Sequence, residues 1–348
     1  MSNQRPGATE RAAIDCLVTG ATGLVGNNVV RMLVDRGKRV RVLVRGGPGN
    51  RSLAGLPIEQ VAGDVMDPDA VGRAAAGARV VVHSAAMVHI GWSRLAEMRR
   101  VNVEGSRVVA SAARRAGARL VHVSSVNALG LTADGSPTDE ETPFGNTVEC
   151  PYVVTKREAE QVVLEEVGRG LDAVILNPVF MLGPWDWKAS SGRMLLEIAQ
   201  GRGLLAPPGS QHFGDVRDVA AAILAAMTAG ACGRRYILGG HHLRFVDAWT
   251  VFARVAGSRP PRGVAPPPVV RLAGRLGDLL SGCVGREGPL NSAAANMSLL
   301  RQDFSSDRAM AELGYRIRPL EESVRDCWQW FLDHGYARAP GRDRTRAA

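Results

Sequence analysis

The stretch Val18-Thr-Gly-Ala-Thr-Gly-Leu-Val-Gly26 decides the fold of this chain. It follows a short apolar run at residues 14–18, which predicts a buried strand. At residues 24–36 the apolar side chains return at helical spacing. A strand, a turn with regularly spaced glycines and a helix together form the element that holds the phosphates of a dinucleotide. The sequence therefore predicts a dinucleotide-binding fold.

Each of the three glycines has its own expected role. Gly20 permits a tight turn, Gly23 lets the backbone approach the pyrophosphate, and Gly26 allows close packing of the helix on the strand. The helix N-terminus then offers unpaired N–H groups and a partial positive charge to the phosphates. The expected phosphate contacts are these glycines and their neighbours Thr22, Leu24 and Val25.

The chain continues as alternating strands and helices as far as residue 178. The predicted strands are residues 39–45, 58–62, 79–83, 119–123 and 173–176. The predicted helices between them begin at Pro68 and cover residues 94–116 and 152–167. Nearly continuous apolar strands are typical of a parallel sheet with helices on both faces. We therefore expect an α/β fold, a Rossmann-type doubly wound parallel sheet with a smaller, mostly helical C-terminal part that binds substrate.

Shifts in composition predict the limits of the domains. The expected parts are a disordered N-terminus at 1–12, a cofactor-binding domain with the catalytic groups at 13–178, a substrate-binding lid region at 179–336 and a basic tail at 337–348. Within the lid region, helices are expected near 192–200, 216–229, 269–280, 290–300, 306–313 and 320–334, with a strand at 235–238. Some of these segments are expected to return to the core of the first domain.

Bulk composition narrows the class of protein. The net charge of +9 comes from basic residues spread along the chain without an aromatic-interleaved patch, so nucleic-acid binding is not expected. The five cysteines lie far apart with no C-x-x-C spacing, which fits a reduced, cytoplasmic protein without a zinc or redox site. No apolar run has the length of a membrane span, and the N-terminus lacks the apolar core of a secretory signal.

A second motif, Tyr152-Val-Val-Thr-Lys156, places a phenol and an amine one helical turn apart. A free phenol has a pKa of about 10, and a neighbouring ammonium lowers that pKa. The chain has only three lysines among 43 basic residues, so an amine rather than a guanidinium at residue 156 is informative. We expect Tyr152 to be the acid–base group, with a hydroxyl from another element holding the substrate oxygen beside it.

The end of the second predicted strand indicates the type of nicotinamide cofactor. An acidic residue there would bind the ribose 2′-hydroxyl and repel a 2′-phosphate. This strand instead ends in Arg45, and no acid follows until Glu59. A guanidinium can pair with a phosphate through two charge-assisted hydrogen bonds. The sequence therefore favours NADP(H) over NAD(H). If Arg45 only stacked on the adenine, the site would accept either cofactor.

These motifs occur in the order found in extended short-chain dehydrogenases/reductases, the superfamily of NAD-dependent epimerases and dehydratases. The segments that resemble this family are Thr19-Gly-Ala-Thr-Gly-Leu-Val-Gly26, Gly63-Asp64, His83-Ser-Ala-Ala86, Val123-Ser-Ser125, Tyr152-x-x-x-Lys156 and Asn177-Pro178. The likeness covers about residues 14–335 and is strongest to the branch of dihydroflavonol reductases and 3β-hydroxysteroid dehydrogenases. It implies a nicotinamide cofactor, a small-molecule substrate and, as in many relatives, the possibility of a homodimer.

The resemblance also implies roles for individual residues. Tyr152 would exchange a proton with the reacting oxygen, Lys156 would hydrogen-bond the nicotinamide ribose and lower the phenol pKa, and Ser125 would hydrogen-bond the reacting oxygen. Ser124 is the second candidate for the role of Ser125. Asn102 matches a cofactor-side position, with helix packing as the alternative. The remaining implied cofactor contacts are Asp64, Val65, Ala85, Ala86, Ser124, Pro178 and Val179.

Several aromatic and polar residues are candidates for the substrate side. Met87, His89 and Trp92 follow the fourth strand, where related enzymes contact substrate, and Asn127 follows the fifth. The segment Trp185-Asp-Trp187 could stack on a flat substrate or close the core beneath the lid.

Other features are expected to be structural. The seven histidines show no metal-ligand spacing with nearby acids, so no metal is expected, and His241-His242 is predicted to be a loop pair. The apolar stripe Val269, Leu272, Leu276, Leu279 and Leu280 is expected to pack inside the lid, with membrane contact as the alternative.

Three functions follow from this pattern, in order of preference. The first is a reductase that acts on a ketone or aldehyde of a bulky, fairly apolar substrate. The second is a nucleotide-sugar epimerase or dehydratase with tightly bound NAD. Asn177 and Gln211 stand where many sugar-nucleotide relatives carry arginine, which weighs against that second function. The third is a non-catalytic NADP sensor, which would not need the Ser/Tyr/Lys set.

Overall fold

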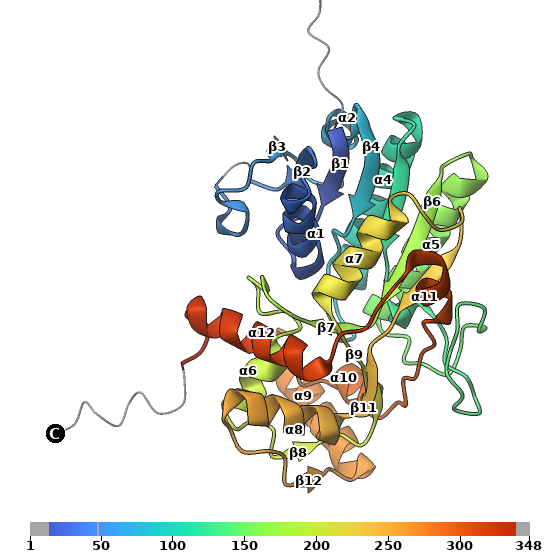
Figure 1. The fold of residues 1–348 in the computed structure, drawn as a ribbon. Coiled ribbons are helices and arrows are strands. Elements are labelled where there is room, and N and C mark those ends of the chain that lie inside the picture. Colours follow the sequence, from blue (N-terminus) through green and yellow to red (C-terminus); the bar gives the residue numbers. More distant parts are fainter. Residues whose placement is uncertain (1–13, 47–48, 339–348) are drawn as a thin grey trace, which may run out of the picture.

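Seven parallel strands form the centre of the molecule (Figure 1). The computed structural model describes residues 14–46 and 49–338. In spatial order the strands are β10 (Arg235–Leu238), β6 (Ala173–Pro178), β5 (Arg119–Val123), β4 (Ala78–His83), β1 (Ile14–Thr19), β2 (Val40–Val44) and β3 (Glu59–Ala62). Each neighbouring pair is parallel, as the continuous apolar runs predicted.

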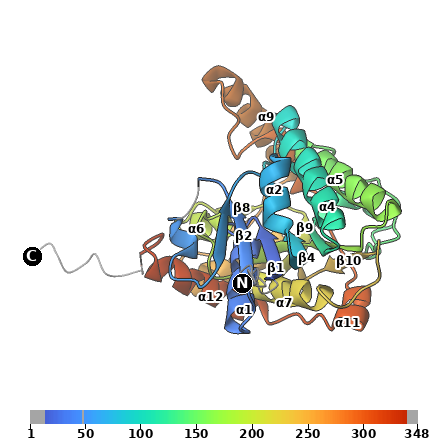
Figure 2. The ribbon, with the colours of Figure 1, turned by 90° about the horizontal axis from the view of Figure 1, so that it is seen from above.

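Helices cover both faces of this sheet, as Figure 2 shows from above. One face carries α1 (Leu24–Asp35), α7 (Val216–Ala226) and α11 (Asp307–Leu313), and the other carries α2 (Pro68–Ala75), α4 (Gly105–Arg115) and α5 (Pro151–Gly168). A separate apolar cluster holds the helices to each face. The α/β doubly wound fold expected from the sequence is confirmed.

The order of the strands creates the place for a ligand. From β1 the chain passes outward to β2 and β3, and then returns to the other side of β1 at β4. At such a reversal the loops diverge and leave a crevice beyond the carboxyl ends of the strands. The glycine turn after β1, residues 84–93 after β4 and Ser124–Ser125 after β5 all follow these carboxyl ends.

The second half of the chain builds a smaller unit at this edge. It contains the three-stranded sheet of β7 (Phe180–Leu182), β9 (Ser210–Asp215) and β11 (His241–Arg244), and the short pair β8 (Leu205–Ala206) and β12 (Gly263–Val264). Its helices are α6 (Arg193–Ala199), α8 (Phe245–Ala256), α9 (Pro267–Val284), α10 (Ser292–Met297) and α12 (Leu320–Asp333). A third apolar cluster, rich in Phe and Trp, packs α6, α8 and α12 together.

The predicted helix at residues 94–116 is divided into three parts. They are α3 (Leu95–Met98), a π-helical segment at Arg99–Glu104 and α4. Within the π-helical segment the Asn102 side chain accepts a hydrogen bond from Met87 N at 2.7 Å and donates to Met87 O at 3.0 Å. This contact ties the bulge in the helix to the loop that follows β4.

Two local predictions for the second half are wrong. His241 and His242 are not in a loop, because they pair with Phe213 and His212 in the antiparallel β11–β9 ladder. The apolar stripe on α9 does not pack inside the lid, because Leu272, Leu276 and their neighbours on the stripe are exposed to solvent. The inner face of that helix is formed by glycines instead.

Some expectations fall outside the described residues. These are the disordered segment at 1–12 and all but the first two residues of the basic tail at 337–348. Among the residues that are described, no helix combines the length and the apolar character needed to cross a bilayer.

Candidate active site

The glycine turn adopts the geometry that its residue types predicted. Gly20 has a φ of +76°, and a Cβ there would lie 2.5 Å from Ala85 N, so the turn after β1 lies directly against the turn after β4. A Cβ on Gly26 would collide with the Gly20 carbonyl group, which brings α1 against the strand. Only residues without a side chain allow this approach.

The N-terminus of α1 fits an anionic group. Gly23 is the N-cap residue, and no side chain caps the helix, so the first N–H groups are free to face a ligand. A Cβ on Gly23 would meet only Gly20 O at 3.3 Å. The backbone on that side is therefore open to a close approach, which suits a pyrophosphate at a helix N-terminus.

Ser125, Tyr152 and Lys156 come together as a buried group. Tyr152 lies in the first turn of α5, directly after Pro151, and Lys156 lies one turn later. Ser125 follows β5, and its hydroxyl is close enough to the Tyr152 phenol to act on the phenol pKa. Lys156 Nζ donates to Val123 O at 3.0 Å, at the end of the same strand. The structure thus joins two motifs that lie 27 residues apart in the sequence.

Burial controls the protonation of this group. Burial raises the pKa of Tyr152 and outweighs the lowering effect of the Ser125 hydrogen bond. Burial lowers the pKa of Lys156 to about 8, against the opposing charge of Glu160. The sequence predicted a lowered phenol pKa, and this expectation is wrong for the protein alone, because the loss of hydration disfavours the phenolate.

Two neutral histidines lie next to Lys156. His83 Nδ1 is 2.7 Å from Thr19 Oγ1, and its ring is 5.4 Å from that of His122. Burial, with a smaller effect from the Lys156 charge, lowers the pKa of His83 to about 3 and that of His122 well below its usual range. Sequence reasoning missed this pair, although histidine is an unusual residue in two otherwise apolar central strands.

Asn177 and Glu160 were also missed as parts of the site. Asn177 is fully buried at the end of β6, and its Nδ2 donates to Ser125 O at 2.9 Å and to Glu160 Oε1 at 2.6 Å. Glu160 Oε2 in turn accepts from Arg235 Nε at 2.6 Å. These hydrogen bonds position the backbone of Ser125. They also hold the buried carboxylate of Glu160 one helical turn from Lys156.

The predicted adenine end contains Arg45 and Asp64. Arg45 follows β2 and is largely exposed, and its Nε lies 4.0 Å from Asp64 Oδ2. Asp64 Oδ1 accepts from Met66 N at 3.0 Å, which fixes the turn after β3. The adjacent Val65 is buried against Gly105. The guanidinium and the carboxylate are therefore close enough to compensate each other's charge.

Other predicted cofactor residues line the same edge of the sheet. Ala85 and Ala86 follow β4 and are half-buried. Ser124 Oγ is buried and has no hydrogen-bond partner among the described residues, which fits a polar group supplied by a ligand. Pro178 ends β6, and the buried Val179 packs with Val126 and Leu129, just beyond Ser125.

The surroundings of Tyr152 are apolar. Its cluster contains Met98, Cys150, Val153 and Ala293, with Met87, Ile90, Phe144, Val148 and Met297 packed against it. Of the predicted substrate residues, Met87 therefore lies in this cluster. Asn127 lies beside the buried Ser125/Tyr152/Lys156 group, because its Nδ2 is 3.3 Å from Ser125 Oγ.

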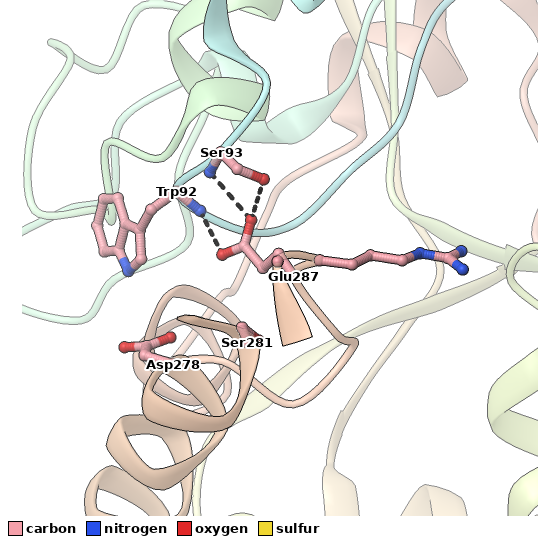
Figure 3. Close-up of a pocket in the computed structure, with 7 residues that line it drawn as sticks. Trp92, Ser93, Asp278, Ser281 and Glu287 are labelled. Atoms are coloured by element: carbon pink, nitrogen blue, oxygen red, sulfur yellow. Dashed lines mark hydrogen bonds between the residues drawn. The ribbon is translucent and has the colours of Figure 1, made fainter. Parts of the chain in front are cut away.

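His89 and Trp92 both contact Glu287, and Figure 3 shows the contact of Trp92. Glu287, beyond the end of α9, accepts hydrogen bonds from Trp92 N at 2.8 Å and from His89 Nε2 at 2.7 Å. Burial alone would raise the pKa of Glu287, but hydrogen bonds from Ser93 and His89 lower it to about 2. Trp92, Ser93 and Glu287 line a pocket of about 500 Å³ between the loop after β4 and α9, and Tyr152 is not part of its lining.

Trp185 and Trp187 pack against protein groups. Trp185 is covered by the Arg31 guanidinium at 3.4 Å from the ring centroid, and Trp187 lies edge-on to Trp330 at 5.2 Å. Both belong to the aromatic cluster around α12. The sequence left two roles open for these tryptophans, stacking on a flat substrate or closing the core beneath the lid. Their contacts favour closing the core.

A group of possible metal ligands forms where the sequence showed none. His212, His242 and Asp303 bring their ligand atoms within 4.8 Å of one another, because β9 and β11 pair side by side. In the structure these atoms hydrogen-bond each other, with His212 Nε2 at 3.0 Å from Asp303 Oδ1. Burial lowers the pKa of His212. The observed contacts are those of a hydrogen-bonded network.

Known proteins share both the sequence and the fold of this chain. The model of the NAD dependent epimerase/dehydratase family matches residues 16–239. The sterol demethylase protein B of Methylococcus capsulatus is 34% identical over 92% of this chain and 98% of its own length. A putative dihydroflavonol 4-reductase of Synechocystis is 31% identical over 94% and 97%. The crystal structure of gox2253 has a TM-score of 0.82 at 36% identity and covers 93% of this chain and 99% of its own.

Proposed function

Because the chain belongs to the NAD dependent epimerase/dehydratase family and is an NAD(P)-dependent oxidoreductase, we propose that it is an NADP(H)-dependent reductase of a bulky, largely apolar ketone or aldehyde. The same site would oxidise the corresponding secondary alcohol in reverse. The observation that carries this proposal is the buried group that brings Ser125 close to Tyr152, with Lys156 one helical turn away. Residues 13–178, joined by β10 and α7, would bind the cofactor, and the rest of 179–336 would enclose the substrate.

In the proposed reaction, the bound cofactor supplies the hydride that adds to the carbonyl carbon. Tyr152 donates its phenolic proton to the carbonyl oxygen, and the Ser125 hydroxyl holds that oxygen. Burial raises the pKa of Tyr152, so the phenol carries its proton at neutral pH, as a proton donor must. The positive charge on Lys156 stabilises the phenolate that remains.

The proposed cofactor residues fit a nicotinamide dinucleotide. The uncapped start of α1 would hold the pyrophosphate, Ser124 Oγ would find its missing partner, and Arg45 would bind a ribose 2′-phosphate. The contact between Arg45 and Asp64 supports NADP(H), because the guanidinium offsets a carboxylate that would repel the additional phosphate. We expect Lys156 to leave Val123 O, at least in part, for the nicotinamide ribose.

The class of substrate follows from the surroundings of the phenol. Met87, Phe144, Val148 and Met297 offer an apolar surface next to Tyr152. Two relatives of nearly full length are named for a sterol and a dihydroflavonol, which are ring compounds of moderate or low polarity. We therefore expect ring-containing ketones to be better substrates than sugar nucleotides, whose diphosphates need cationic ligands.

The test combines native mass spectrometry with an assay of NADPH oxidation against a panel of ring-containing ketones. The wild-type protein should bind NADPH reversibly and oxidise it with at least one member of the panel. Tyr152→Phe should still bind NADPH but lose activity by at least about a hundredfold. Tyr336→Phe removes a phenolic hydroxyl that donates to Trp187 O at 2.6 Å, and this variant should remain active.

Two outcomes would contradict the proposal. Substantial activity of Tyr152→Phe would remove the acid–base assignment. NAD that stays bound through purification and resists exchange would indicate internal recycling of the cofactor, as in an epimerase or dehydratase. It would also contradict the role given to Arg45.

A further inference from the structure

The side chain of Tyr152 lies beneath an apolar cover and is only 8% exposed. Ala293 of α10 is buried in the same cluster, and Met297 of α10 packs against it. From the opposite side, Met87 and Ile90 of the loop after β4 pack against this cluster. A bulky ketone must bring its oxygen within hydrogen-bond distance of the phenol. Part of the cover must therefore move before a substrate of the proposed class can react.

Helices α9 and α10 form one arm of the molecule, residues 267–297. Gly277 is one of the buried residues of α9, and a Cβ on it would collide with the backbone of Leu290. Ser292 N donates to Asp278 Oδ1 at 3.0 Å, which joins the start of α10 to α9. Figure 2 shows α9 projecting beyond the helices that flank the main sheet. The two helices therefore hold each other more closely than α9 holds the rest of the molecule.

Both ends of the arm are fixed to the smaller unit at nearly the same place. Before the arm, Ala265 N donates to Ala206 O at 2.8 Å. After the arm, Ser210 N donates to Leu300 O at 3.0 Å. Because Ala206 and Ser210 are only four residues apart, the two attachments lie close together and can serve as one hinge.

A carboxylate holds the tip of the arm to the loop after β4 (Figure 3). Glu287 lies between α9 and α10, and it accepts from Trp92 N at 2.8 Å and from Ser93 N at 3.0 Å. It also accepts from Ser93 Oγ, and His89 Nε2 lies 2.7 Å from its Oε2. A Cβ on Gly91 would collide with this carboxylate, so the loop is shaped around it. Polar contacts, which water can replace, therefore hold the arm at this end.

Two neutral hydrogen bonds lie beside this carboxylate. Trp92 Nε1 donates to Ser292 Oγ at 2.8 Å, and Asn291 Nδ2 donates to Ile90 O at 2.8 Å. A hydrogen bond to a charged acceptor is roughly twice as strong as a neutral one. Since Glu287 accepts several, it contributes the larger share of this polar attachment.

We propose that the arm opens as a unit about this hinge to admit the substrate, and that Glu287 is the latch that keeps it closed. Opening carries Ala293 and Met297 away from the cluster and exposes Tyr152 on that side. Local opening requires little free energy where exposed hydrogen bonds can be exchanged for water. The passage to Tyr152 rests on the proposed function, whereas the latch itself does not.

A cysteine of the chain can report this opening. Cys150 is fully buried in the cluster that contains Tyr152 and Ala293. Cys16 of β1 and Cys327 of α12 are also fully buried, but they belong to other clusters. The full chain is incubated with iodoacetamide in native buffer, and peptide mass spectrometry gives the rate of modification of each thiol. Cys150 then reports opening of the arm, and the other two report unfolding of the rest.

Glu287→Gln should speed the modification of Cys150 by at least about tenfold, because hydrogen bonds to a charged acceptor are lost. Ser292→Ala removes the acceptor of one neutral hydrogen bond and should speed it by about threefold. Cys16 and Cys327 should keep their wild-type rates in both variants, since the latch does not touch their clusters.

Glu321→Gln is the matched control, because it makes the same change in an exposed ion pair of α12 and should leave the rates unchanged. A wild-type rate at Cys150 in Glu287→Gln would overturn the proposal, and so would an equal acceleration of Cys16. Modification of wild-type Cys150 as fast as that of the exposed Cys232 would show that the arm is not closed. The experiment reads no activity, so its failure would leave the proposed reaction standing, and a protein without reductase activity would still reveal the latch.

Discussion

At the scale of single residues, a buried positive charge dominates the candidate site. Lys156 is buried with its ammonium on a carbonyl oxygen, and burial lowers its pKa to about 8. His83 and His122 stay neutral beside it, since burial and the Lys156 charge both lower their pKa values. Glu160 is the nearby carboxylate that favours the charged amine. Burial therefore disfavours the charged form of this amine. When the amine is charged, its positive charge can stabilise a phenolate.

This arrangement predicts how stability depends on pH. The pKa of Lys156 is about 8 in the folded protein and 10.5 in a free side chain, so between these values the unfolded state binds the additional proton. The stability of the wild type should therefore rise with pH across that window, relative to Lys156→Met. Urea titrations without cofactor should find the variant more stable at pH 7, by at most about 3 kcal/mol, and this advantage should vanish near pH 10.5.

Lys188→Met is the control, because Lys188 is exposed and its substitution should leave the pH dependence of the wild type unchanged. An advantage of Lys156→Met that stayed constant from pH 7 to 10.5 would contradict a lowered pKa for Lys156.

Spacing alone predicted part of the residue-level site. Tyr152 and Lys156 share one helix, so the distance between them is already contained in the sequence. Glu160 and Asn177 were missed, because the contacts that define them join residues 17 and 52 positions apart through the packing of α5 on β5 and β6. The expected direction of the Tyr152 pKa was wrong, because the sequence shows which charges are near but does not show the degree of burial.

At the scale of elements, the first half of the chain was predictable and the second half only in part. Central parallel strands are continuous apolar runs and stand out from the helices between them. In contrast, β9 reads Ser-Gln-His-Phe-Gly-Asp, and its polar residues are buried because they bond to neighbouring elements. Helix α8 was not predicted, although its Phe and Trp residues recur at helical spacing. For α9, periodicity predicted the helix but could not show which face is turned to the protein.

Two glycines of α9 predict opposite effects of the same substitution. A Cβ on Gly277 would collide with the backbone of Leu290, whereas a Cβ on Gly282 would meet no atom within 4 Å. Gly277→Ala should therefore destabilise the attachment of α9 by about 1–3 kcal/mol, while Gly282→Ala should stabilise the helix by up to about 1 kcal/mol. Hydrogen exchange of the α9 amides measures the attachment, and denaturant unfolding measures the whole protein. Equal protection in the two variants would contradict the inward position of Gly277.

At the scale of the whole molecule, ion pairs connect the main sheet to the smaller unit. Arg217 at the start of α7 donates to Asp326 of α12 at 2.6 Å, and Arg318 donates to Asp218 at 2.8 Å. Several charges in one partly buried network hold geometry better than isolated surface pairs. The Arg217–Asp215 pair belongs to this network, and Gly183, which follows β7, packs against Asp215 and Val216. Binding of a cofactor in the crevice beyond the sheet should therefore stabilise the molecule as a unit.

Thermal unfolding with each cofactor tests both this coupling and the choice of nicotinamide. A ligand that binds only the folded state at a hundredfold excess over its Kd adds about 2.7 kcal/mol, which corresponds to a rise of several degrees in Tm. NADPH should raise the Tm of the wild type more than NADH at the same concentration, because we propose that Arg45 pairs with the 2′-phosphate. Arg45→Glu should reverse the order, since a carboxylate repels that phosphate and binds the 2′-hydroxyl. Arg316→Glu makes the same change of charge at an exposed site on the loop after α11, and it should keep the wild-type order. An Arg45→Glu protein that still preferred NADPH would show that the selectivity lies elsewhere in the crevice.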